Sequence, residues 1–200
     1  EHFKAKISPQ ELIDKTIAFN NSQFNDILEK IKGNYKFKEN DIATGIDVHQ
    51  DFINEKHLSI LKDESIKKGY GIFNLSQTEY DKLKLTQKEK QLVKPFYTTE
   101  ELFRYYGDPK NHLWVIYSDM GVRKNIDEYP HIKAHLDKFK KVITSDFGPY
   151  GLHRAREQRF FEGEKIISLR KTSQPYFTYT DFPCYVSQTY FVIKPEDINL

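Results

Sequence analysis

The chain has 200 residues, about the length of one large domain, and its 31 Lys and Arg against 29 Asp and Glu leave a net charge of only +2. Hydrophobic residues make up 38% and aromatic residues 14%, which supplies a packed core and excludes global disorder. A single cysteine, Cys184, excludes a disulfide framework and a zinc site built on several thiolates.

The first 34 residues are expected to form a helical connector. Ser8-Pro9-Gln10-Glu11 is a capping box with proline at the first helical position, and apolar residues follow at helical spacing as far as Ile31. This pattern predicts one broken helix or two short ones over 9–32, ended by Gly33-Asn34. The alternating residues 35–38 predict a strand, so we expect a second domain over 35–200.

The second domain mixes strand and helix signals. A strand over 72–75 is followed by three Ser/Thr-x-x-Glu sequences that begin at Ser76, Thr86 and Thr98, which predict three short helices between residues 77 and 106. The aromatic and β-branched run 113–117 predicts a buried strand, and apolar residues at a spacing of about 3.6 after Pro130 predict a helix over 130–142.

The last third is strand-like. Strands are predicted over 165–169, 176–180 and 185–193, separated by prolines, and Trp114 and Phe191 are expected in the core. The predicted fold class is α+β: a mixed β-sheet domain with short helices, preceded by the N-terminal helical connector.

The positive charge is concentrated in the second half. All six arginines lie beyond residue 100, and from Arg104 to Lys171 there are 14 basic residues against 9 acidic ones. This stretch is also rich in Tyr, Phe and His. A basic and aromatic segment of this kind is a candidate nucleic-acid surface.

Motifs for catalysis are incomplete in this sequence. Gly69-Tyr70-Gly71 precedes a strand and so does not have the position of a cofactor-binding glycine turn. Asp146, Glu162 and Glu164 only faintly suggest a nuclease, and His131 and His135 lack a third metal ligand nearby. We therefore expect no catalysis, no metal and no cofactor in this segment by itself.

One stretch of the sequence is similar to a known family. It runs from Ser145-Asp146-Phe147-Gly148-Pro149-Tyr150-Gly151-Leu152-His153-Arg154-Ala155-Arg156 to Tyr185-Val186-Ser187-Gln188-Thr189-Tyr190. With earlier blocks such as Gly45-Ile46-Asp47, Trp114-Val115-Ile116-Tyr117 and Tyr129-Pro130 in the same order, it resembles the TaqI-like C-terminal specificity domain. That domain is the target-recognition domain of restriction-modification N6-adenine DNA methyltransferases, and the resemblance covers roughly residues 40–195.

The resemblance implies a function for a longer parent chain. Residues 35–200 would recognise double-stranded DNA in a sequence-specific way, and residues 1–34 would be the tail of an absent catalytic domain. An upstream methyltransferase domain would bind S-adenosylmethionine and methylate adenine, with or without a fused endonuclease. Since the chain starts at Glu1 and its only methionine is Met120, we expect it to be a segment of that parent.

Candidate DNA contacts follow from the residue types. Guanidinium groups donate two hydrogen bonds to guanine, while lysines, hydroxyls and tyrosines bind phosphates or stack. The candidates are Tyr150, His153, Arg154, Arg156, Arg159, Arg170, Lys171 and Thr172. Arg154, Arg156 and Arg159 are alternatively structural partners of Glu157, Glu162 or Glu164.

Two other functions stay open. The segment is alternatively a protein-docking module of a DNA-defence complex, in which exposed aromatic residues face protein, or a divergent metal-dependent nuclease. No stretch reaches the roughly 18 apolar residues of a membrane span, and one cysteine is typical of a reducing compartment. We expect the parent in the cytoplasm of a bacterium or archaeon, associated with the nucleoid and with no membrane partner.

Overall fold

The computed structural model describes residues 37–196. The chain divides into two compact units, 1–36 and 37–200, and the first lies wholly outside the described residues. The predicted helix over 9–32 and the connector over 1–34 therefore also lie outside them. Of the predicted strand over 35–38, the two described residues are irregular and lead into a 3-10 helix, η2 (Glu39–Asp41).

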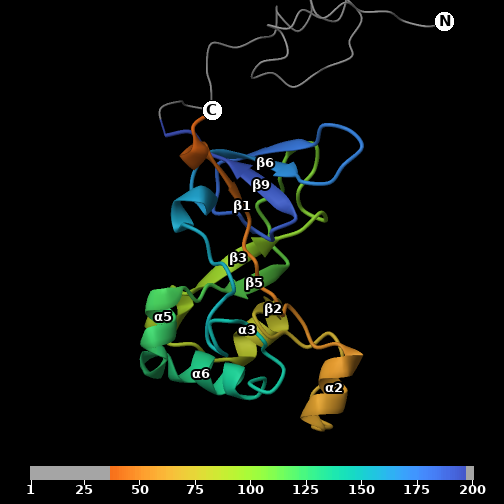
Figure 1. The fold of residues 1–200 in the computed structure, drawn as a ribbon, viewed down its shortest axis with the longest axis vertical. Coiled ribbons are helices and arrows are strands. Elements are labelled where there is room, and N and C mark those ends of the chain that lie inside the picture. Colours follow the sequence, from red (N-terminus) through yellow and green to blue (C-terminus); the bar gives the residue numbers. More distant parts are fainter. Residues whose placement is uncertain (1–36, 197–200) are drawn as a thin grey trace, which may run out of the picture. The chain divides into compact units, whose positions relative to one another are not determined.

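The described residues form two sheets, and the first has five strands in the order β1-β9-β6-β7-β4, of which Figure 1 labels β1, β9 and β6. Its strands are β1 (Ile42–Thr44), β9 (Tyr190–Ile193), β6 (Lys165–Leu169), β7 (Phe177–Thr180) and β4 (Tyr105–Tyr106). All neighbours are antiparallel except β4 and β7, which run parallel. The predicted strands over 165–169 and 176–180 are confirmed here.

The second sheet has four strands in the order β2-β5-β3-β8. They are β2 (Asn74–Ser76), β5 (Leu113–Ile116), β3 (Val93–Tyr97) and β8 (Tyr185–Val186). The strands expected over 72–75 and 113–117 are confirmed with small shifts. The strand predicted over 185–193 is two strands, β8 and β9, because Ser187-Gln188-Thr189 forms a turn that transfers the chain from one sheet to the other.

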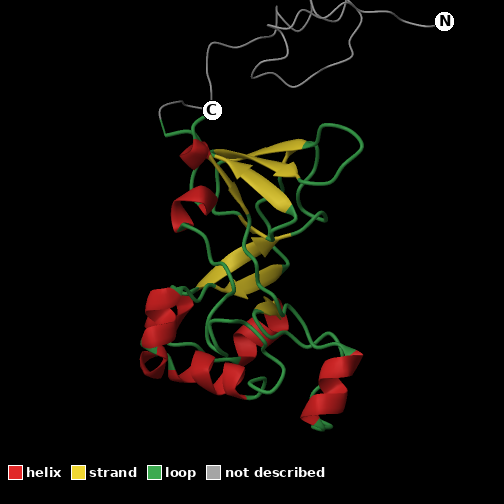
Figure 2. Cartoon of the chain, viewed as in Figure 1, coloured by secondary structure: helices red, strands yellow, loops and turns green. Residues whose placement is uncertain are grey.

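The α-helices lie on the side of the four-stranded sheet that faces away from the five-stranded sheet (Figure 2). They are α2 (Glu55–Leu61), α3 (Gln77–Lys82), α4 (Gln87–Lys90), α5 (Met120–Lys124) and α6 (Pro130–Asp137). With η2, two further 3-10 helices, η3 (Ile126–Glu128) and η4 (Gln158–Phe161), complete the elements of residues 37–196. The predicted α+β class is confirmed, and no helix within 37–196 is long and apolar enough to cross a membrane.

Two of the three predicted Ser/Thr-x-x-Glu helices are confirmed. Ser76 and Thr86 cap α3 and α4, each with its glutamate reaching back. The third prediction is wrong, although Glu101 does accept hydrogen bonds from Thr98 at 2.8 and 2.9 Å. The chain there makes one turn only, because Leu102 pairs with Gly107 and β4 begins at Tyr105.

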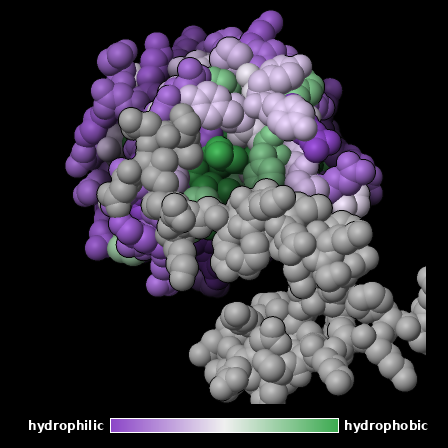
Figure 3. Space-filling model, turned by 90° about the horizontal axis from the view of Figure 1, so that it is seen from above, coloured by the Kyte–Doolittle hydropathy of each residue, from purple (hydrophilic) through white to green (hydrophobic). Residues whose placement is uncertain are grey.

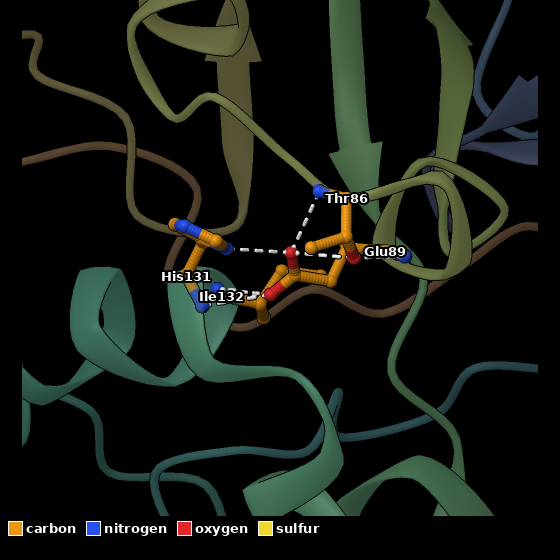
Figure 4. A network of polar contacts seen from close by, with 4 residues as sticks. All are labelled: Thr86, Glu89, His131 and Ile132. Atoms are coloured by element: carbon orange, nitrogen blue, oxygen red, sulfur yellow. Dashed lines mark hydrogen bonds and ion pairs between the residues drawn. The ribbon is translucent and has the colours of Figure 1, made fainter.

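Glu89 joins two helices (Figure 4). Its side chain has no exposed surface, and its carboxylate accepts hydrogen bonds from the Thr86 backbone and hydroxyl at 2.9 Å. It also accepts from the backbone N–H groups of His131 and Ile132 at 2.7 and 3.2 Å and contacts the His131 ring at 2.8 Å. One carboxylate thus caps α4 and satisfies the free N–H groups at the start of α6.

The helix predicted over 130–142 is shorter than expected. It ends at Asp137, and the residues after it continue as hydrogen-bonded turns in which Phe139 and Val142 are buried. The core is one cluster that draws on both sheets and α6, including Phe73, Ile116, Phe161, Tyr185 and Val192. Trp114 packs against this cluster, as expected, with its ring stacked on Tyr80 at 4.7 Å.

Candidate nucleic-acid interface

The end of β1 is the scaffold of the candidate site. At Gly45 a Cβ atom would lie 2.2 Å from the carbonyl oxygen of Ser187, so only glycine allows the turn after β8 to approach so closely. The backbone N–H of Gln188 donates to the carbonyl of Ile46 at 2.7 Å, and its side chain donates to Asp47 at 3.1 Å. The turn 187–189 is therefore fixed against residues 45–47.

The same short segment also fixes Arg154. The backbones of Asp47 and Arg154 form an antiparallel bridge with N···O distances of 3.0 and 3.2 Å. The side chain of Arg154 is exposed, and no described residue accepts a hydrogen bond from it or pairs with its charge. It is available to a partner outside this domain.

Arg156 is held in a different way. Its backbone is in the left-handed region, with φ +65°, and its carbonyl accepts a hydrogen bond from the hydroxyl of Tyr117. Its guanidinium donates to the hydroxyl of Thr44, while its Nε is buried with no partner among the described residues. The group is half-buried and incompletely satisfied, which is costly for a charged donor.

Arg170 reaches the site from the other side of the turn. It follows β6, its backbone N–H donates to Thr189, and its guanidinium donates to the Gln188 carbonyl at 2.9 Å. The guanidinium also lies 5.3 Å from the centre of the Phe191 ring. These contacts orient an exposed arginine without neutralising its charge.

Arg154, Arg156 and Arg170 form one group, which we call the arginine cluster. The pKa of Arg156 is lowered, first by burial and then by the positive charge of Arg154, with a further contribution from Arg170 that Asp47 partly opposes. The guanidinium stays charged at neutral pH nonetheless. The charges of Arg154 and Arg170 disfavour the charged form of Arg156, and the Asp47 carboxylate opposes them only in part, so this group favours the approach of an anion.

Arg159 lies outside this cluster. Its guanidinium pairs with Glu157 at 2.8 Å and with Glu196 at 3.2 Å, donates to the carbonyl of Asn40 at 2.7 Å and lies over the Phe160 ring at 4.1 Å. Arg159 is only three residues from Arg156 in sequence, whereas Arg170, which is farther along the chain, lies in the arginine cluster. The role predicted for Arg159 in DNA binding stays a prediction, and its neighbours are those of a structural arginine.

The other four candidates lie in two places: two in an exposed loop and two packed against other parts of the domain. Lys171 and Thr172 lie in the exposed loop after β6, where Thr172 makes local hydrogen bonds to Gln174 at 2.8 and 3.3 Å. No described residue pairs with the Lys171 ammonium. Lys171 is thus free to contact phosphate, and Thr172 shapes the loop that carries it.

Tyr150 and His153 make contacts to other parts of the domain. The Tyr150 hydroxyl donates to Asp137 at 2.6 Å, and its ring lies under Lys140. The His153 ring stacks on His49 with centroids 5.3 Å apart and lines a cavity of about 210 Å³ next to Phe147. Neither side chain joins the arginine cluster through a hydrogen bond or ring contact.

The five-stranded sheet has an exposed face that the sequence patterns did not identify. Thr44, Phe191, Ser168 and Phe177 lie side by side across four strands, and Ile42, Ile193, Ile166, Tyr179 and Tyr106 form the next row. We call these nine residues the aromatic face. The assignment of Phe191 to the core is wrong: its side chain is 37% exposed because it alternates with the buried Tyr190 and Val192.

The residues considered for catalysis do not meet in one place. Glu162 accepts a hydrogen bond from Tyr185 at 2.7 Å and Glu164 accepts one from Tyr179 at 2.9 Å. His135 is buried, and burial lowers its pKa to about 4, so it is a neutral donor to the carbonyl of Ile72 at 2.9 Å. Within residues 37–196 no three His, Cys, Asp or Glu side chains are grouped to hold a metal ion.

Comparisons with known proteins show similarity of structure and none of sequence. No protein-family model matches this chain, and no curated protein matches its sequence. Among solved structures, the chain is similar to the Type IIL restriction-modification enzyme MmeI, determined in complex with DNA, with a TM-score of 0.48 and 10% sequence identity. The match covers 78% of this chain and 19% of that chain, so this chain spans less than a fifth of the length of that enzyme.

Proposed function

We propose that residues 35–200 recognise a short, asymmetric sequence in duplex DNA for a restriction-modification N6-adenine methyltransferase. The observation that supports this proposal is the arginine cluster, in which exposed Arg154 and Arg170 flank the half-buried Arg156. In this role the domain has no chemistry of its own. It binds DNA and positions an upstream catalytic domain of the parent chain.

The residues divide the two tasks of duplex recognition. Arg154 has all its guanidinium donors free, as a bidentate contact to guanine O6 and N7 requires, and such a contact contributes about 1–3 kcal/mol of discrimination. Arg170 and Lys171 border the exposed loop after β6 and are suited to phosphates, which fix the register of the protein on the duplex. The half-buried Arg156 adds to the positive potential of the arginine cluster.

In the parent chain, the upstream domain would carry S-adenosylmethionine and the chemistry of methyl transfer. Enzymes that modify a base turn it out of the stack, which makes correct placement on the DNA decisive for the target adenine. Any endonuclease activity would likewise belong to other parts of the parent. The whole assembly would act in the cytoplasm, on the nucleoid.

Methylation-site mapping in a host that expresses the full-length parent tests this function. The wild-type parent should methylate adenine within one sequence context. Arg154→Ala should relax or abolish that context, because each lost bidentate contact reduces discrimination about 10- to 100-fold. Arg123→Ala is the matched control, since this arginine sits on α5 and donates to the Phe147 carbonyl at 3.0 Å.

The outcomes separate the proposal from its alternatives. If Arg154→Ala and Arg170→Ala leave both the methylated sequence and its extent unchanged, the arginine cluster does not read DNA. If the parent cleaves DNA in a metal-dependent way that Glu162→Ala or Glu164→Ala abolishes, the nuclease alternative replaces the proposal.

A further inference from the structure

The aromatic face exposes large apolar side chains on adjacent strands. Tyr106 is 63% exposed, Phe177 47%, Tyr179 39% and Phe191 37%. Phe177 and Phe191 flank Ser168 at one level, and Tyr179 lies opposite Tyr106 at the next. In the view of Figure 3, which looks onto the end of the domain that carries this sheet, hydrophobic residues gather within a mostly hydrophilic surface.

This face is continuous with the arginine cluster. Thr44, whose hydroxyl accepts from Arg156, is the first residue of the row that contains Phe191 and Phe177. Phe191 lies under the Arg170 guanidinium. The surface that presents the rings therefore begins where the candidate DNA contacts end.

An undistorted duplex gives these rings few base contacts. Five strands have four gaps of about 4.8 Å each, so the sheet is about 19 Å wide. The major groove of B-form DNA is about 12 Å wide and admits a helix or a two-stranded ribbon. The aromatic face is broader than this groove, and stacked bases expose their edges there, whereas ring faces become accessible only where base steps are opened.

Unpaired nucleotides fit the chemistry of the face. Each unstacked base presents a ring face that an exposed Phe or Tyr can cover, while neighbouring cations bind the phosphates. Arg170, whose guanidinium lies 5.3 Å from the Phe191 ring, and Lys171 border the face at the end of β6. Glu164, the acid that bonds Tyr179, is engaged by that hydroxyl at 2.9 Å. The cationic border favours a polyanion over a protein partner.

We propose that the aromatic face binds unpaired nucleotides of a DNA strand, with bases stacked on Phe177, Tyr179 and Phe191 and phosphates near Arg170 and Lys171. This inference rests on the proposed function, because the strand would be continuous with the DNA held at the arginine cluster. The domain would then bind a duplex with a locally opened or single-stranded segment more tightly than a fully paired one.

Fluorescence anisotropy with the 200-residue chain tests the inference. The probes are a labelled duplex and the same duplex with an unpaired extension of about 12 nucleotides that carries 2-aminopurine, a base whose fluorescence falls when it stacks. We expect the extension to tighten binding about 100-fold and its fluorescence to be quenched. Phe177→Leu and Tyr179→Leu should each weaken binding of the extended probe about tenfold. Neither variant should change the affinity for the plain duplex.

Two further variants sharpen the result. Tyr179→Phe keeps the ring and removes the hydrogen bond to Glu164, so it should bind the extended probe like the wild type. Ile60→Ala removes a side chain of similar exposure, 42%, from α2 and should have no effect on either probe.

The failures of the two proposals are distinguishable. If the extension adds no affinity, or if both Leu variants bind the extended probe like the wild type, the aromatic face does not bind nucleotides, whatever the duplex result. A protein occupant is then the better interpretation of this face. If instead Arg154→Ala leaves duplex binding unchanged while the Leu variants weaken binding to the extension, the duplex-recognition role fails and the nucleotide-binding face stands.

Discussion

Lys165 is a lysine in the core at the start of β6. Its side chain has no exposed surface, and its ammonium donates to the carbonyls of Gly163 and Phe182 at 2.7 and 2.6 Å. Burial lowers its pKa from 10.5 to about 8. The two carbonyls hold the charged form in place, but they do not replace its hydration.

This burial predicts a dependence of stability on pH. Between about pH 8 and 10.5 the unfolded chain binds a proton at Lys165 that the folded chain has released, so folding gains stability as the pH rises. The wild type should gain about 3 kcal/mol in free energy of unfolding relative to Lys165→Met over this range. Urea unfolding of both proteins at several pH values measures the difference.

The control for this prediction is Lys68→Met. Lys68 pairs with Glu55 at 2.9 Å on the surface, where its side chain is 67% exposed. Its difference from the wild type should be flat over the same pH range. A flat difference for Lys165→Met as well would mean that the buried ammonium keeps an ordinary pKa.

At the scale of elements, Glu89 links α4 to α6. Its pKa is lowered from 4.5 to about 2 by hydrogen bonds from Thr86, His131 and Ile132, which together outweigh the opposing effect of burial. The ionised carboxylate therefore stabilises the fold fully above about pH 4.5, and this contribution is lost as the pH falls toward 2.

Replacement of Glu89 should destabilise α4 and α6. In Glu89→Gln an amide nitrogen faces backbone donors, and the charge-assisted hydrogen bonds are lost, so we expect a loss of about 3 kcal/mol in free energy of unfolding at pH 7. The loss should shrink as the pH falls below about 4.5. Glu55→Gln, whose partner is the exposed Lys68, should change stability by less than about 0.5 kcal/mol. Equal losses in the two variants would contradict the role of Glu89.

The helices and strands that the sequence predicted correctly are those that residues close together in sequence specify. Capping boxes located α3 and α4, and the aromatic, β-branched run located β5. At Thr98 the capping contacts form, yet pairing of Leu102 with Gly107 prevents a helix. β3 contains Pro95 and β1 has three residues, so neither has a strong strand pattern, and both exist because tertiary pairing supplies their partners.

In the candidate site, too, contacts between residues close in sequence could be predicted, whereas contacts between distant residues could not. Arg154 and Arg156, both candidate DNA contacts, are two residues apart in sequence and also lie close together in the structure. The ion pair of Arg159 with Glu196 and the hydrogen bond from Arg170 to the Gln188 carbonyl join residues far apart in sequence, so the sequence did not predict them. The aromatic face depends on register across five strands, which alternation within one strand does not reveal.

On the scale of the whole molecule, net charge explains little about DNA binding. A total of +2 gives a weak average field, so affinity for a polyanion must come from the local arrangement of cations. Each phosphate that a cation neutralises releases counterions and contributes about −0.9 to the slope of log affinity against log salt. The slope therefore counts the cations that contact phosphate.

The arginines can be sorted by this slope. Duplex affinity of the 200-residue chain, measured by anisotropy over a series of salt concentrations, should have a slope of about −2 to −4 if Arg170, Lys171 and their neighbours contact phosphates. Arg170→Gln should make the slope less steep by about 1. Arg159→Gln should leave it unchanged, because Glu157 and Glu196 already pair with that guanidinium.

The opposite result would reassign the two residues. If Arg159→Gln changes the slope and Arg170→Gln does not, the ion pairs of Arg159 open on binding and the duplex lies over η4 instead of over the turn 187–189. A slope near zero for the wild type would exclude a phosphate-binding surface altogether. Neutral contacts would then account for binding, as expected of a domain that docks on protein.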